Sequence, residues 1–208
     1  LGFAAALYGF ALALRRPVAG GAMLGLGAGV GFLSAGFVAI VWTAVTALAL
    51  PVAFPTWRTR GHALTAGVAL AVAIVLGGTW PLALFLRAPG HLHAWWAAQS
   101  PGDFLAPLDA AASGDATVLL KNLPWFAWPA LPLVAWTLYT RGRGFNGGLA
   151  TPGVQLPAMA ALVIGAAILA MAGPRLIILM PLLLPLSLLA ALEIDTLKRG
   201  YSGALDWF

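Results

Sequence analysis

Residues 64–86 read LTAGVALAVAIVLGGTWPLALFL, and no charged side chain interrupts this apolar stretch. An α-helix rises about 1.5 Å per residue, so the stretch is long enough to cross the roughly 30 Å hydrocarbon core of a bilayer. Lipid offers no hydrogen-bond partners to the backbone, whereas a helix satisfies its backbone groups internally. The stretch therefore predicts a transmembrane helix.

The composition of the whole chain agrees with a membrane protein. Of its 208 residues, 62% are hydrophobic and 8% are charged, and the mean hydropathy is +0.95. A water-soluble domain could not bury so much apolar surface. The formal net charge is +5, but the basic residues form small clusters between apolar stretches, which argues against nucleic acid as a partner. The chain has no cysteine, which excludes disulfides and thiolate metal sites.

Further apolar stretches predict an all-α fold, a polytopic bundle of about seven membrane segments in a single transmembrane domain over residues 1–208. Because the chain opens with Leu1 inside an apolar stretch, we expect a fragment of a longer protein with a truncated first segment. The expected segments are Leu1 to Leu14, Val18 to Leu33, Gly36 to Phe54, Leu64 to Leu86, Val118 to Tyr139, Pro152 to Ala172 and Arg175 to Leu192.

Basic residues set the expected topology, because cytoplasmic loops carry an excess of Lys and Arg. Once Arg15 and Arg16 are placed in the cytoplasm, alternation of the segments puts most basic residues on that side. The cytoplasmic set is Arg15, Arg16, Arg58, Arg60, Arg141, Arg143, Lys198 and Arg199. The opposite side receives Arg87, Lys121 and Arg175, together with an outer loop at about residues 87–117.

The second and third segments are short and meet at Ser34–Gly36, which predicts a tight hairpin. In the second segment, Gly21, Gly25 and Gly29 recur at every fourth position. They share one helix face, where another helix can approach closely. A phosphate-binding loop is the alternative for GLGAGVG, residues 25–31. It is disfavoured because the spacing departs from GxGxxG and the stretch lies in a membrane segment.

The outer loop holds polar side chains that suit a functional site: His91, His93, Asp103, Asp109 and Asp115. Two histidines without a spaced third ligand are weak evidence for a metal, so no metal site is assigned. The aspartates are candidates for a general base or a metal ligand, although exposed loops carry acids routinely. Trp95 and Trp96 lie in the same loop. An interfacial aromatic belt is favoured for this pair over stacking on a sugar ring.

Two basic residues stand at the outer ends of apolar segments. Lys121 either neutralises an anionic headgroup or snorkels to the membrane surface, and snorkelling is favoured. Arg175 opens the last segment, which also holds Pro181 and Pro185. From these residues alone, a proline-kinked segment with a snorkelling arginine is slightly favoured over an anion site.

Four stretches carry a resemblance to a known family: GLGAGVGFLSAGF (25–37), KNLPWFAWPALPL (121–133), PRLIILMPLLLPLSLLAALEIDTLKRG (174–200) and ALDWF (204–208). Together they resemble the bacterial integral-membrane glycosyltransferases related to aminoarabinose transferase and protein O-mannosyltransferases. The two C-terminal stretches are the most specific. The family's R-x-x-Y-x-x-P-x-x-x-P segment is similar to Arg175, Pro181 and Pro185, with Ile178 at the tyrosine position. Its lysine-bearing hairpin corresponds to Leu33–Gly36, which has no lysine.

The resemblance implies a polyprenyl-phosphate-linked sugar donor and a reaction on the periplasmic side of the bacterial inner (cytoplasmic) membrane, in a multi-pass protein. It also implies that Arg175 and Lys121 contact the donor phosphate, since a planar guanidinium makes paired charge-assisted hydrogen bonds to phosphate. The histidines, tryptophans and Asp103 of the outer loop are weaker candidates for acceptor or headgroup contacts. The family's catalytic acids lie in an earlier loop, which would precede Leu1, so the chain offers no assigned catalytic base.

These observations predict a membrane glycosyltransferase that moves a sugar from polyprenyl phosphate to an acceptor hydroxyl of lipid A, protein or a glycan. The hydroxyl loses its proton to a carboxylate, and cationic side chains stabilise the charge that grows on the departing phosphate. A divalent metal stays open as a cofactor. A lipid or solute transporter (flippase) is the main alternative, because helices interrupted by Pro and Gly suit alternating access. A non-catalytic membrane scaffold is the third.

Overall fold

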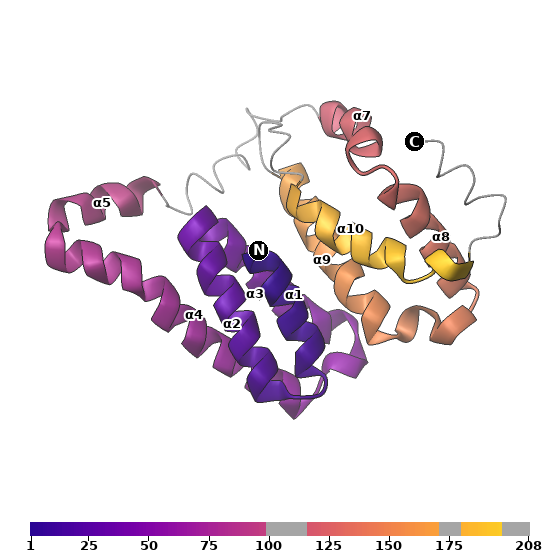
Figure 1. Cartoon of the computed structure of the whole chain (residues 1–208), viewed down its shortest axis with the longest axis horizontal. Coiled ribbons are helices and arrows are strands. Elements are labelled where there is room, and N and C mark those ends of the chain that lie inside the picture. The colour runs from indigo at the N-terminus through magenta and orange to yellow at the C-terminus, as the bar shows by residue number, and fades with distance from the viewer. Residues whose placement is uncertain (99–115, 171–179, 197–208) are drawn as a thin grey trace. The chain divides into compact units, whose positions relative to one another are not determined.

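The computed structural model describes residues 1–98, 116–170 and 180–196, and every secondary-structure element in these ranges is a helix (Figure 1). The all-α prediction is therefore confirmed for the described residues. The chain divides into two compact units. Unit 1 comprises Leu1–Ser113 with Ala170–Ala172, and unit 2 comprises Gly114–Leu169 with Gly173–Phe208.

In unit 1, α2 packs between α1 and α4 and also contacts α3 (Figure 1). The helix α5 follows α4 and packs against it. The elements of the described part of unit 1 are α1 (Gly2–Ala13), α2 (Pro17–Ala35), α3 (Phe37–Ala53), the 3-10 helix η1 (Pro55–Trp57), α4 (Arg60–Arg87) and α5 (Pro89–Ala98).

Local chemistry explains where these helices begin and end. Pro17 stands in the first turn of α2, where a backbone N–H would have no helical partner. Gly36 ends α2 with a φ of 69°, a positive value that glycine adopts without a Cβ clash, and α3 starts directly after it. The Thr59 hydroxyl accepts a hydrogen bond from the backbone N of His62 (3.1 Å) and caps α4. The expected hairpin is present, and α2 with 19 residues is longer than expected.

One glycine face of α2 lies against α4. A Cβ at Gly25 would lie only 2.5 Å from the Ala69 carbonyl oxygen, and a Cβ at Gly29 would lie 2.8 Å from Leu76 Cβ. Gly21 is equally close to the start of α4. The predicted glycine face is therefore confirmed, and α4 is the helix that approaches it. Residue numbers rise together along both helices, so α2 and α4 run parallel.

A second glycine face of α2 lies against α1. The Cα positions of Gly20 and Gly27 are so close to Ala13 and Ala6, respectively, that an added Cβ would collide with α1 backbone. Along this contact the residue numbers fall in α1 as they rise in α2, so the two helices run antiparallel. Small residues permit this close approach of α1 and α2, because a larger side chain would hold the two backbones apart.

The helix directions gather basic residues at one end of unit 1, where α1 and α3 end and α2 and α4 begin. The hydroxyl of Thr65 donates a hydrogen bond to the Pro17 carbonyl (3.1 Å) and joins the beginnings of α2 and α4. We call residues 13–17 and 54–62 the basic end. It contains Arg15, Arg16, Arg58 and Arg60. The opposite end, residues 32–37 and 77–96, is called the aromatic end.

Among the described helices, α2 and α4 are long and apolar enough to cross a membrane. Only 11% of the most apolar 18-residue window of α4 is buried within the protein. Leu70 and Ile74 are each 62% exposed, and Val75 is 69% exposed. A core helix of a soluble protein would bury such side chains, so their exposure favours lipid as the surrounding medium.

In unit 2 the segment expected from Val118 to Tyr139 is interrupted. The first helix ends at Phe126 and the next begins at Ala130, because Pro129 has no backbone N–H and disfavours helical geometry in the residue before it. The prediction of one continuous helix was wrong. The described elements are α7 (Ala116–Phe126), α8 (Ala130–Gly142), the 3-10 helix η3 (Phe145–Ala150), α9 (Pro152–Ala170), α10 (Met180–Ala191) and the 3-10 helix η5 (Ile194–Thr196).

A buried ion pair joins the C-terminal ends of α8 and α10. The Nε atom of Arg141 lies 2.5 Å from Oε1 of Glu193, whose residue is 1% exposed. The side-chain amide of Asn146 donates to Oε2 of the same carboxylate (2.9 Å). These donors satisfy a charge that would be costly to bury alone. The Thr137 hydroxyl donates to the Leu189 carbonyl (3.0 Å) one turn before the ion pair in both helices, so α8 and α10 run in the same direction.

We expect Gly25→Ala to destabilise unit 1 by roughly 1–3 kcal/mol, because the new methyl group would press on α4 backbone. Gly67→Ala is the matched control, since nothing lies within 4 Å of a Cβ at that position. The measurement is the denaturation midpoint of each purified variant in detergent micelles. Equal midpoints for the two variants would show that α2 and α4 do not pack through this face.

We expect Glu193→Gln to lower the stability of unit 2 by about 3–5 kcal/mol, because it leaves the Arg141 charge without its buried partner. Asp195→Asn removes an exposed carboxylate two residues away and serves as the control. Replacing Arg141 by Met and Glu193 by Leu together should recover much of the loss. Denaturation midpoints test all three variants, and a double variant no better than Glu193→Gln contradicts the pairing.

Candidate functional site

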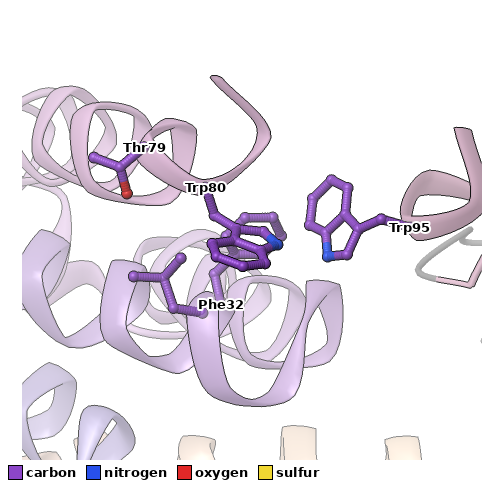
Figure 2. A pocket seen from close by; sticks show the side chains of 5 residues that line it. Phe32, Thr79, Trp80 and Trp95 are labelled. Atoms are coloured by element: carbon purple, nitrogen blue, oxygen red, sulfur yellow. The ribbon is translucent and has the colours of Figure 1, made fainter. Parts of the chain in front are cut away.

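The aromatic end of unit 1 contains a pocket of 520 Å³ between α2, α4 and α5 (Figure 2). Its lining residues are Phe32, Leu33, Thr79, Trp80 and Trp95. In Figure 2 the Trp95 indole extends from α5 toward Trp80 of α4 and Phe32 of α2. Binding sites for small molecules are typically concave and aromatic with few polar groups, and this pocket has that character.

Close packing of α2 and α4 holds Phe32 in the pocket wall. Phe32 is buried, and a Cβ at Gly77 of α4 would lie 2.9 Å from its ring. The absence of a side chain at Gly77 therefore makes room for this ring. Phe37 lies just beyond the Gly36 turn, with its ring centroid 5.2 Å from that of Phe32 at an interplanar angle of 65°.

Edge-to-face contacts attach α5 to this wall. The rings of Trp95 and Phe32 are 6.0 Å apart at 88°, and those of Trp96 and Phe37 are 5.6 Å apart at 85°. Such pairs contribute roughly 0.5–1.5 kcal/mol beyond area burial. We call Phe32, Phe37, Trp95 and Trp96 the aromatic cluster. It fixes the position of α5 relative to the α2–α3 turn.

The chemistry of this pocket suits binding rather than proton abstraction. Residues 1–98 contain no Asp or Glu, so no carboxylate of this stretch can act as a general base here. The Thr79 hydroxyl donates to the Leu76 carbonyl (2.6 Å), which leaves its oxygen able to accept a hydrogen bond. Half-exposed Trp80 adds an indole face. A ligand ring with apolar faces and hydroxyl groups at its edge could stack on the indole face and donate a hydrogen bond to the Thr79 oxygen.

The sequence-predicted residues of the outer loop are distributed as follows. His91, His93, Trp95 and Trp96 lie on α5, so the first part of the expected loop is helical. Both histidines are exposed, and neither belongs to the aromatic cluster. Asp103, Asp109 and Asp115 lie outside the described residues. The preference for an interfacial belt over sugar stacking stays a prediction.

The two predicted phosphate contacts are Lys121 and Arg175. Lys121 lies on α7 of unit 2 and is exposed, and Arg175 lies outside the described residues. Within the described ranges, no three His, Cys, Asp or Glu side chains gather as metal ligands would.

Sequence reasoning did not single out Phe32, Gly77, Thr79 or Trp80. A usable signal exists in hindsight: GGTW, residues 77–80, places three small residues directly before an aromatic one in the last third of α4. In the same way Phe32 follows the glycine face of α2. Each aromatic residue therefore follows small residues at which the two helices pack closely.

Comparisons with known proteins do not identify the family of this chain. No protein-family model matches the chain, and neither a curated protein nor a solved structure matches it.

Proposed function

We propose that the chain is the membrane part of a bacterial glycosyltransferase that moves a sugar from polyprenyl phosphate to a periplasmic acceptor such as lipid A, protein or glycan. In this proposal about seven membrane segments form a multi-pass bundle in the inner membrane. The aromatic end of unit 1 faces the periplasm.

The observation that carries the proposal is the position of the aromatic pocket, at the end of unit 1 opposite four arginines. An excess of basic residues marks the cytoplasmic side of a membrane protein, which supports an outer location for the pocket. A lipid-linked sugar carries its ring at the membrane surface, where the indoles of Trp80 and Trp95 offer flat apolar faces.

The proposed reaction needs two kinds of charged group. A carboxylate accepts the proton of the acceptor hydroxyl while the oxygen attacks the anomeric carbon, and the bond from that carbon to the phosphate oxygen breaks. Polyprenyl phosphate leaves with the bonding electron pair. Cationic groups stabilise this developing charge, and Arg175 and Lys121 are the proposed donors. Exposure of Lys121 is compatible with that role.

A specific observation also favours the second candidate, a lipid or solute transporter. The interruption between α7 and α8 divides an apolar stretch into two short helices. Discontinuous helices are a recurrent feature of transporters, where their ends contact the substrate. The two functions differ in chemistry, because only the transferase releases polyprenyl phosphate in detergent solution, where no compartments exist.

The test uses the purified full-length protein in detergent with a panel of radiolabelled polyprenyl-phosphate sugars, each offered with lipid A, protein and glycan as acceptors. We expect Trp80→Ala to raise the KM for the donor about tenfold, if an indole face contributes roughly as much as aromatic stacking on a nucleobase does. Phe85→Ala is the control, since this aromatic residue of α4 is exposed and does not line the pocket. Absence of polyprenyl phosphate release from every donor contradicts the transferase, and equal KM values in the two variants contradict the pocket's role.

A further inference from the structure

A second pocket, of 340 Å³, lies at the basic end of unit 1. It is separate from the aromatic pocket and shares no lining residue with it. Its walls come from the end of α1, the beginning of α2, η1 and the beginning of α4. The lining residues are Ala13, Leu14, Pro17, Thr56, Trp57, Thr59, Gly61 and His62.

The side chain of His62 forms part of the pocket wall and is held by a carbonyl group that Pro51 leaves without a helical donor. Because Pro51 lies inside α3 and has no N–H, the carbonyl of Ala47 one turn earlier has no helical donor. The Nε2 atom of His62 hydrogen-bonds to that carbonyl (2.9 Å). The His62 ring also contacts the ring of Trp57, which is 2% exposed, at 5.8 Å and 82°. The pocket is therefore built on fixed side chains.

Arg58 closes the end of α3 beside this pocket. Its Nε donates to the Pro51 carbonyl (2.6 Å) and its Nη2 to the Val52 carbonyl (2.9 Å). These carbonyls belong to the last turn of α3, where a cation is favourable. Arg58 thus has a structural partner within the protein.

The remaining arginines of the basic end have no counter-ion within the described part of unit 1. Residues 1–98 contain Arg15, Arg16, Arg58, Arg60 and Arg87 but no Asp or Glu. Arg15, Arg16 and Arg60 are exposed and stand next to lining residues in the chain. The beginnings of α2 and α4 carry partial positive charge and the ends of α1 and α3 carry partial negative charge, so the net positive charge of this end comes from the arginines. Thr56, Thr59 and His62 supply polar groups to a mainly apolar pocket wall, and the unpaired arginines beside it are suited to an anion that carries an apolar part.

We propose that this pocket binds the phosphodiester of an anionic phospholipid from the cytoplasmic leaflet. The arginines supply charge-assisted hydrogen bonds to the phosphate, and the Thr59 hydroxyl can donate another while it accepts from the backbone of His62. Exposed apolar side chains along α4, including Leu64 and Leu70, continue from this end and accommodate the acyl chains. The proposal rests on the membrane location proposed above and is independent of sugar transfer.

The experiment measures thermal denaturation of the full-length protein in detergent while one ligand is titrated. The ligands are dioleoylphosphatidylglycerol, dioleoylphosphatidylcholine with the same acyl chains, and inorganic phosphate. A ligand that binds only the folded protein raises the Tm in a saturable way. We expect phosphatidylglycerol to give the largest shift. An equal shift with phosphatidylcholine, or a full shift with inorganic phosphate alone, overturns the lipid assignment.

Charge variants test the arginines. We expect Arg16→Gln and Arg60→Gln each to weaken the apparent affinity for phosphatidylglycerol about fivefold, the usual effect of one basic residue near an anionic membrane surface. Arg87→Gln is the matched control, because it removes an arginine from the aromatic end. An equal loss in the control overturns the assignment to the basic end.

A pocket-filling variant distinguishes binding in the pocket from general attraction of the lipid to the exposed arginines. Thr56→Phe places a bulky side chain in the pocket and leaves every arginine in place, so we expect it to abolish the preference for phosphatidylglycerol over phosphatidylcholine. A preference like that of the wild type overturns the pocket. Should the variant fail to fold, Thr56→Leu repeats the test with a smaller side chain.

Loss of sugar transfer in the separate donor assay would leave these outcomes unchanged. Recovery of the protein without detergent would contradict the membrane location on which both proposals rest.

Discussion

The close approach of α1 and α4 to the glycines of α2 is the contact on which the arrangement of unit 1 depends. Helices surrounded by lipid gain little from the hydrophobic effect on association, so van der Waals contact between backbones stabilises their packing. The contacts of Gly21, Gly25 and Gly29 along α4 show that α4 is parallel to α2, and those of Gly20 and Gly27 along α1 show that α1 is antiparallel. These directions place arginines at one end and the aromatic pocket at the other, so both proposed sites follow from the same packing.

The fold was predictable from the sequence where it depends on residues that are close together in the chain. Gly21, Gly25 and Gly29 define a face by their spacing alone, and the structure places α4 against that face. The break between α7 and α8 was not predicted, because hydropathy continues through Pro129 and a proline in such a stretch equally suits a kinked helix. The buried pair of Arg141 and Glu193 was missed for a different reason. Its partners lie far apart in the sequence, and a basic residue after an apolar segment is ordinarily a topology signal.

The candidate site was predictable only in part. The residues Trp95 and Trp96 were recognised as functional candidates, but their partners Phe32 and Phe37 come from the α2–α3 turn and are identified only by tertiary packing. The role of Gly77 in making room for a ring is likewise invisible in a sequence, because it depends on which helix lies opposite.

The most direct test of the account is the sidedness of the two ends of unit 1. The chain has no cysteine, so single cysteines at Ser34 of the aromatic end and Thr56 of the basic end can be labelled without background from this chain. Both positions are exposed. With a membrane-impermeant maleimide, we expect Ser34→Cys to react in intact cells and Thr56→Cys to react only after the membrane is permeabilised. Labelling of both cysteines in intact cells, or of neither, would contradict it.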